Sequence, residues 1–335
     1  MTRLLAAARF PLASLVIAGL LHAQGDPIPF PVEKTTDLRE PGQIYTVEGR
    51  QTIGHRVTID GLRHCTIRGV GADATLVLEG KLQLKAVTGG KIRFENVQLE
   101  IAPECKELTL SDAVFVGGGM RMTPETTSRV KLFAIKTEFT GGATCDLVSS
   151  EGKLEFQSCS FDSRVTIVGA PRSEKSGSNV VVQLEACSGT ENGRWRGLLG
   201  GLKITGTKSV LVRNCDLGAS ETAFVDVPRL DFDGNNARSA MTSFSQSEYG
   251  AFGKTHIRNC DFRTKLVFSA PPHERDADKA ERLMLDHCYF DGRTDPEQIA
   301  KAMIVDHSTD PEVSVLCTFA KISAVPLGLG GTGGR

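Results

Sequence analysis

The chain of 335 residues carries 39 basic and 40 acidic side chains, and 40% of its residues are hydrophobic. This balance of charge argues against a nucleic acid or an anionic membrane as a partner. The hydrophobic content is sufficient for a packed core, and no Gly- or Pro-rich linker interrupts the middle of the chain. We therefore expect one continuous domain.

The first 23 residues have the features of a secretory signal peptide. Arg3 and Arg9 give a basic start, and residues 12–21 form an apolar run that is too short to span a membrane. The run ends at Leu21-His22-Ala23, where Ala23 is the small residue that signal peptidases require. We expect a cleaved signal and a secreted, periplasmic or cell-surface protein; the alternative is a buried N-terminal helix.

The remaining chain divides into a lead-in, a main domain and a tail. Residues 24–56 begin with Pro27, Pro29 and Pro31, which favour an extended lead-in and cap. Residues 57–325 form the expected main domain, and residues 326–335 are a Gly-rich tail expected to be flexible.

One short pattern recurs along the main domain. In Leu154-Glu-Phe156-Gln-Ser-Cys159-Ser-Phe161, apolar residues alternate with polar ones, then a small polar residue precedes a cysteine and an aromatic residue. Similar patterns follow at intervals that are mostly 20–29 residues long. The position of the cysteine, called here the slot, is expected to hold Cys65, Val97, Ala113, Thr137, Cys159, Cys187, Cys215, Asn235, Cys260, Cys288 and Cys317.

A fixed period of this length indicates a stacked solenoid. The alternation of period two and the abundance of Val, Ile, Leu, Phe and Thr favour strands. The sequence therefore predicts an all-β, parallel β-helix of about ten or eleven coils, with one short helix at residues 295–303, where Asp295 and Pro296 can cap a first turn.

Two further rows follow from the stacking of the repeats. The residue before the slot should bend the chain in a left-handed conformation, as Asn214 and Asn259 would. The outward residue two places before the slot alternates in charge, which would fix the register of neighbouring coils. This row comprises Glu185, Arg213, Asp233, Arg258 and Asp286.

These apolar-x-apolar-x-Asn-Cys-x-Phe units resemble those of the right-handed parallel β-helix, or pectin-lyase-like, superfamily over residues 57–319. The resemblance implies a fold that hosts several unrelated functions. Loops of unequal length, expected to leave one corner of the coil, would surround any binding surface. These loops span residues 169–179, 206–208, 226–229, 245–253 and 269–281, with a further insert at 190–201 that contains Trp195 between Arg194 and Arg196.

The nine cysteines are an odd number, so at least one thiol cannot form an internal disulfide. Slot cysteines stacked in parallel should keep their sulfur atoms apart, so mostly unpaired, buried cysteines are favoured over disulfides, catalysis or a metal site. Cys105 and Cys145 lie outside the slot, and the repeat does not place them.

Two sets of residues are candidates for catalysis. Asp216 and Asp261 share one outward position two coils apart, about 9.6 Å, which suits an inverting pair of carboxylates. Leu285-Asp286-His287 is similar to a calcium-binding stretch of the pectate lyases of this fold, for which Arg213 or Arg258 would be the base. The alternative for both sets is that the repeat itself places these residues on a polar face.

The functional interpretation therefore stays divided. We expect a monomeric, non-catalytic binding or structural module without a cofactor, facing polysaccharide, with Trp195, Arg196, Arg213 and Arg258 as candidate binding residues. The alternative is a polysaccharide lyase or glycoside hydrolase acting on acidic glycans through Asp216, Asp261, Asp286 and His287, with calcium if it is a lyase. A third possibility is an adhesin-like module that binds another protein.

Overall fold

The computed structural model describes residues 28–29, 42–54, 56–122, 129–170, 177–188, 190–191, 194–195, 201–218, 221–237, 241–245, 254–262, 265–269, 282–290, 303–306 and 317–322. Beyond Cys260 the description is limited to strands and their pairing. The expected signal peptide and tail lie outside these residues. So does the expected helix, except for Met303, which begins a strand.

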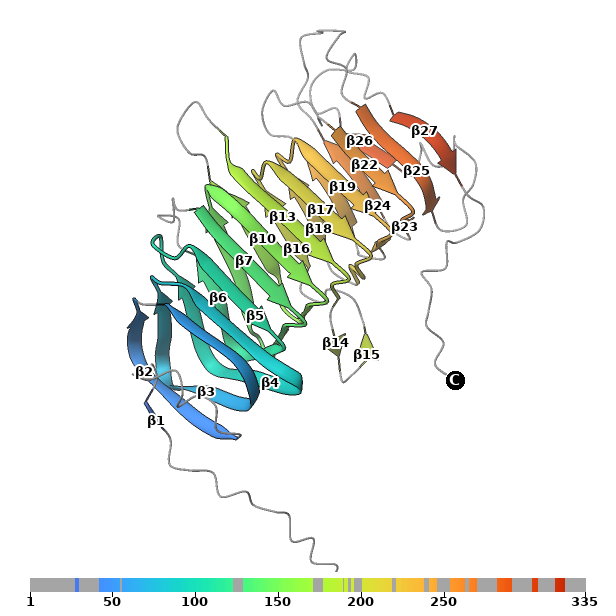
Figure 1. Cartoon of the computed structure of the whole chain (residues 1–335). Helices are drawn as coiled ribbons and strands as arrows, with labels where there is room; N and C mark the ends of the chain where they lie inside the picture. Colours follow the sequence, from blue (N-terminus) through green and yellow to red (C-terminus); the bar gives the residue numbers. More distant parts are fainter. Residues whose placement is uncertain are drawn as a thin grey trace, which may run out of the picture.

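The described chain is an all-β parallel solenoid (Figure 1). Each coil has three faces, and four long strands bend around the corners between them: β2 (Gln43–Ile53), β3 (Val57–Leu78), β4 (Leu82–Ile101) and β6 (Ala113–Met122). The short strand β1 (Ile28–Pro29) pairs with β2, so part of the expected lead-in stacks on the solenoid. Within the described residues no helix is long and apolar enough to cross a membrane.

Shorter strands continue each face along the stack. The first face begins with residues 57–62 and 82–86 and continues through β5 (Glu107–Ser111), β7 (Arg129–Ile135), β10 (Glu151–Gln157), β13 (Asn179–Glu185), β17 (Ser209–Arg213), β19 (Arg229–Asp233), β22 (Lys254–Arg258), β25 (Arg282–Phe290) and β27 (Cys317–Ile322).

The second face follows the bend, and the third face follows the second. After the long strands, the second face contains β8 (Glu138–Thr140), β11 (Ser160–Phe161), β20 (Asn236–Ala237) and β23 (Asp261–Phe262). The third face contains β9 (Thr144–Ser149), β12 (Val165–Gly169), β16 (Leu202–Thr205), β18 (Thr222–Val225), β21 (Met241–Ser245), β24 (Lys265–Ser269) and β26 (Met303–Asp306).

Side chains that share a register position form continuous columns inside the solenoid. On the second face, four phenylalanine rings stack with centroids 4.6–4.9 Å apart and planes within 9° of parallel. This spacing matches the distance of about 4.8 Å between neighbouring strands, because each ring comes from the next coil. The four rings belong to Phe94, Phe115, Phe139 and Phe161.

The predicted left-handed bend between the first and second faces is confirmed. Seven consecutive coils have a residue there with φ between 48° and 65°, and most of these residues are not glycine. The bend residues are Asp112, Lys136, Ser158, Ala186, Asn214, Gly234 and Asn259. The predicted loops also leave one corner, since the strands on either side of each loop stack as third-face and first-face strands.

The expected slot assignment is wrong at two positions, Val97 and Cys317. Ile92, and not Val97, pairs with the slot residues Cys65 and Ala113, while Val97 pairs with Gly118 on the third face. Asn96 does have a left-handed backbone, but it bends the chain at the next corner.

Cys317 is likewise misplaced, because it pairs with Leu283 of the first face and not with the slot. The reason is the same at both positions: alternating apolar residues line every face, so the pattern alone does not distinguish one corner from another.

The slot side chain forms a hydrogen bond to the backbone at the bend. Sγ of Cys187 donates to the carbonyl of Phe156 at 3.4 Å, and Sγ of Cys215 donates to the carbonyl of Leu184 at 3.6 Å. In each case the acceptor lies one coil earlier, near the end of the first-face strand. A small apolar residue with a weak donor fits this position, since it fills the corner and satisfies a buried backbone group.

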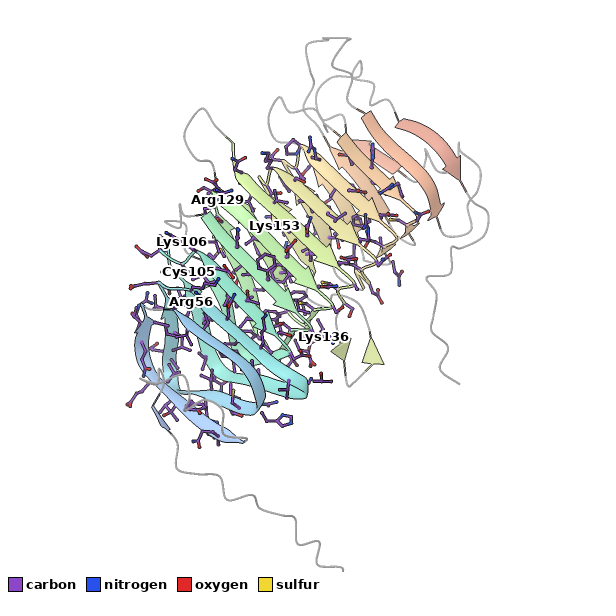
Figure 2. All side chains as sticks on the ribbon, in the orientation of Figure 1. Arg56, Cys105, Lys106, Arg129, Lys136 and Lys153 are labelled. Atoms are coloured by element: carbon purple, nitrogen blue, oxygen red, sulfur yellow. The ribbon has the colours of Figure 1, made fainter. Side chains whose placement is uncertain are left out.

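The described cysteines are reduced thiols, as predicted: Cys65, Cys105, Cys145, Cys159, Cys187, Cys215 and Cys260. The two cysteines that the repeat does not place are also buried. Cys105 lies in the connection from β4 to β5 (Figure 2), and Cys145 faces the interior from β9, between Met120 and Val165 in the register.

Native protein is therefore expected to react slowly with a thiol reagent such as DTNB. Burial raises the pKa of Cys65 to about 12 and that of Cys105 to about 11, so little reactive thiolate exists near pH 8. In peptide maps of labelled native protein, Cys65, Cys105 and Cys159 should therefore carry little label. Rapid labelling of Cys65 or Cys159 would contradict the buried column, and denatured protein serves as the control for full labelling.

Candidate functional site

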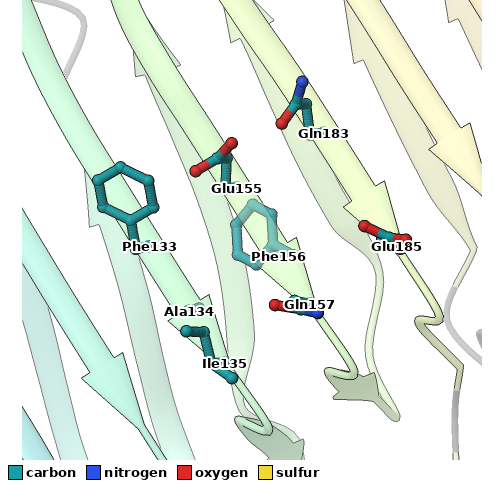
Figure 3. Close-up of a pocket in the computed structure, with 8 residues that line it drawn as sticks. All are labelled: Phe133, Ala134, Ile135, Glu155, Phe156, Gln157, Gln183 and Glu185. Carbon is teal, nitrogen blue, oxygen red and sulfur yellow. The ribbon is translucent and has the colours of Figure 1, made fainter.

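A shallow hollow lies on the outer surface of the first face, across β7, β10 and β13 (Figure 3). Its volume is about 220 Å³. Phe133, Glu155 and Gln183 occupy one register position on the three strands. The next outward position holds Ile135, Gln157 and Glu185. The hollow therefore combines one outward aromatic ring with carboxylates and amides.

The strand geometry explains why these side chains meet. Residues of a strand point alternately to the two sides, so Leu132 and Ala134 pack inside while Phe133 points outward. Phe133 is half-buried, because the neighbouring strand brings Glu155 alongside it. Glu155 forms an ion pair with Lys153 of the same strand.

The side chains of the hollow can make both apolar and hydrogen-bonding contacts. An aromatic face packs against apolar C–H surfaces, whereas carboxylates and amides accept and donate hydrogen bonds. The carboxylate of Glu185 at the edge is exposed, and its register neighbour Arg213 lies 3.9 Å from Asp233 instead. The hollow is thus open to solvent and has an acidic edge.

The alternating charge row predicted from the sequence lies directly beside this hollow. Glu185, Arg213, Asp233, Arg258 and Asp286 pair in succession from β13 to β25. This is the row that the sequence predicts, and it includes two of the candidate binding residues.

The two arginines of the row are engaged by neighbouring carboxylates. Nη2 of Arg258 lies 3.0 Å from Oδ1 of Asp231 and 3.3 Å from Oδ2 of Asp233. Asp233 also accepts a hydrogen bond of 2.8 Å from Nδ2 of Asn259. Arg213 and Arg258 are both about two-fifths exposed (40% and 38%), so these pairs contribute little stability but hold the arginines across the face.

Asp216 and Asp261 occupy a different face. Asp216 pairs with Asn236, and Asn236 pairs with Asp261, so the two aspartates lie two coils apart in the second face, as the repeat predicts. The left-handed bend separates them from the row that contains Arg213 and Arg258. The structure therefore does not bring the two sets of sequence candidates onto one surface.

The other candidates are placed only by their strands. Asp286 and His287 are in β25, where Asp286 pairs with Arg258. Trp195 is in β15 (Arg194–Trp195), which pairs with β14 (Thr190–Glu191) in a separate antiparallel hairpin that projects from the solenoid (Figure 1). Arg196 lies outside the described residues.

Sequence reasoning missed Phe133, Glu155 and Gln183. One signal was present: Phe133 is an aromatic residue at an outward position of a strand whose neighbours carry Glu155 and Thr109 there. That signal requires the register, because the three residues are more than 20 positions apart in sequence. Trp195 is the only tryptophan of the chain, but composition does not place it at a binding surface.

Among the described residues, no three His, Cys, Asp or Glu side chains come together as a metal site. In comparisons with known proteins, no family model matches the chain, and neither a curated protein nor a solved structure matches it.

Proposed function

We propose that this protein is an exported, monomeric and non-catalytic binding module that holds a polysaccharide against the first face of its solenoid. The observation that supports this proposal is the hollow in which Phe133 lies beside Glu155 and Gln183. A sugar ring would pack one apolar face on Phe133 and hydrogen-bond through its hydroxyl groups to the carboxylates and amides. We also propose that the solenoid is right-handed and that the chain is a member of the pectin-lyase-like superfamily.

The ion-paired row supports binding over catalysis. A general acid or a proton-abstracting base needs a group poised to exchange a proton with the substrate. Arg213 and Arg258 are instead paired with Asp231 and Asp233 along a flat surface. Such a row suits a scaffold whose coils are held in register.

One observation favours the alternative that the protein is an enzyme. Asp216 and Asp261 share a register position with Asn236 between them, and two coils correspond to about 9.6 Å. This separation is close to that of an inverting carboxylate pair. In this alternative, Asp286 and His287 would provide a second site, with calcium, for a lyase reaction on uronic acids.

Replacing Phe133 with alanine is expected to weaken binding to a responsive glycan at least tenfold, which corresponds to about 1.4 kcal/mol. The matched control is Leu211→Ala, since Leu211 is half-buried and occupies the same outward row next to Gln183, outside the hollow. The mature protein is screened against a panel of soluble neutral, amino-sugar and uronic-acid polysaccharides, and affinity is measured by calorimetry.

An equal loss in both variants would contradict a role for the hollow, and so would a lack of binding across the panel. A parallel incubation with uronic-acid polymers and calcium follows the absorbance of unsaturated products. Product formation that Asp286→Ala abolishes would replace the proposal with the lyase alternative.

A further inference from the structure

The hollow on the first face has an excess of negative charge. Its outward side chains include two carboxylates and two carboxamides, and no lysine or arginine is among the eight described residues that line it. The polar members are Glu155, Gln157, Gln183 and Glu185. Glu155 has a cation partner, Lys153, which lies two positions earlier on β10 and outside the lining. Glu185 forms no ion pair with any described side chain, and its place in the charge row explains why.

Glu185 is the first acid of the alternating charge row, and the row leaves it without an arginine. Nε of its register neighbour Arg213 lies 3.9 Å from Oδ2 of Asp233, the next acid of the row. Asp233 is also paired with Arg258. On the side of the hollow, the register neighbour of Glu185 is the uncharged Gln157. The carboxylate of Glu185 is therefore exposed at the edge of the hollow (Figure 3), where a ligand can reach it.

An aromatic ring beside carboxylates is a combination that favours a cation. The face of a phenyl ring attracts an ammonium group, and Phe133 supplies a ring at the outward register position next to Glu155. Glu155 and Glu185 come from neighbouring strands, two register positions apart. Their Cα atoms are thus about 8 Å apart, from a strand spacing of about 4.8 Å and a rise of about 3.3 Å per residue.

This arrangement distinguishes ligands by their charge. An ammonium group has three N–H donors and forms strong, charge-assisted hydrogen bonds with carboxylates. A carboxylate of a ligand in the same place would instead meet two groups of like charge, which disfavours its binding. A neutral hydroxyl group gains or loses little from the charge of the hollow.

We propose that the glycan held by the hollow is an amino-sugar polymer with free, protonated amines, and that Phe133, Glu155 and Glu185 select it over neutral and acidic polysaccharides. This inference rests on the proposed function and adds the class of sugar to it. The protonated amine lies against Phe133 and donates hydrogen bonds to the carboxylates. The same carboxylates exclude acidic polysaccharides, on which the enzyme alternative would act.

The test compares three oligosaccharides of equal length: one of glucosamine, its fully N-acetylated form, and one of galacturonic acid. Affinities for the full mature chain are measured by calorimetry in a mildly acidic buffer, where the amines are protonated and the carboxylates of the protein are ionised. The glucosamine oligosaccharide should bind about tenfold more tightly than the N-acetylated form, and the galacturonic acid oligosaccharide should bind least. Added salt should weaken only the glucosamine complex.

Two substitutions test the charges of the hollow separately. Glu185→Gln keeps the size of the side chain, and it should weaken glucosamine binding about fivefold while leaving binding of the N-acetylated form unchanged. Lys153→Met should strengthen glucosamine binding about twofold, because Glu155 then loses its internal cation. A variant that fails to fold would not gain affinity. The matched control is Asp146→Asn, which removes an exposed negative charge from the third face and should change neither affinity.

Equal binding of the glucosamine and N-acetylated forms, with Phe133→Ala weakening both, would overturn this inference and leave the proposed function standing. A preference for the galacturonic acid oligosaccharide would also overturn the inference, and so would equal effects of Glu185→Gln and Asp146→Asn. If neither the three oligosaccharides nor any polysaccharide of the panel binds, the proposed function fails, and the inference fails with it.

Discussion

Replacing Phe139 with alanine is expected to lower the free energy of unfolding by about 3–5 kcal/mol. Phe139 is 1% exposed, and its ring stacks between those of Phe115 and Phe161 at 4.9 Å on both sides. Removing the ring leaves a cavity in the middle of the column and ends two stacking contacts. Urea unfolding followed by circular dichroism measures the loss.

The control for this variant is Phe133→Ala, which deletes the same ring from the outer side of the first face. It should cost no more than about 1 kcal/mol, since Phe133 is half-buried and solvent can fill the space. Equal losses from the two substitutions would show that the rings do not form an interior column. The dependence of the free energy of unfolding on urea concentration must be the same in the wild type and the variants. A change in this slope would indicate that the coils of the solenoid unfold in separate steps.

Replacing Asn235 with alanine should cost about 2–5 kcal/mol. Asn235 is fully buried in the slot, where Oδ1 accepts from the N–H of Cys215 and Nδ2 donates to the carbonyl of Val212, each at 2.9 Å. Alanine leaves both backbone groups buried without partners, and each orphan costs about 1–3 kcal/mol. Chemical unfolding of the purified variant measures the difference.

Asn235→Cys is the informative comparison, because cysteine occupies the slot in the neighbouring coils. There Sγ of Cys215 accepts from the N–H of Cys187 at 3.4 Å and donates to the carbonyl of Leu184 at 3.6 Å. A thiol should therefore restore part of the loss caused by alanine. If cysteine and alanine prove equally destabilising, the slot hydrogen bonds have no energetic role and cysteine is present for its size alone.

The features that sequence predicts here are those that one repeat determines by itself. Alternation of apolar and polar residues indicates strands, and Asn214 and Asn259 mark the bend because asparagine tolerates a left-handed backbone. The bend also accepts Lys136, Ser158 and Ala186, which such preferences alone would not select. The repeat identifies these bend residues, because each of them directly precedes the slot.

The features that sequence does not predict depend on neighbouring coils. Val97 looks like a slot residue because the corner after Asn96 has the same local pattern as the corner before the slot. The hollow arises only when Phe133, Glu155 and Gln183 meet across three strands. Oγ of Ser188 and Oδ1 of Asn236 are buried without a hydrogen-bond partner. The sequence does not predict this either, because the burial of an outward side chain depends on the neighbouring coils.

The register has a consequence for how the chain can acquire its structure. Leu132, Leu154 and Val182 pair in succession, so each coil is ordered by the coil that precedes it in the chain, at a separation of a few dozen residues. A polypeptide that emerges from the ribosome with its N-terminus first can thus add each new turn to a finished template. Growth at one end, as in the elongation of a filament, would let the early coils form before the later ones have been synthesised.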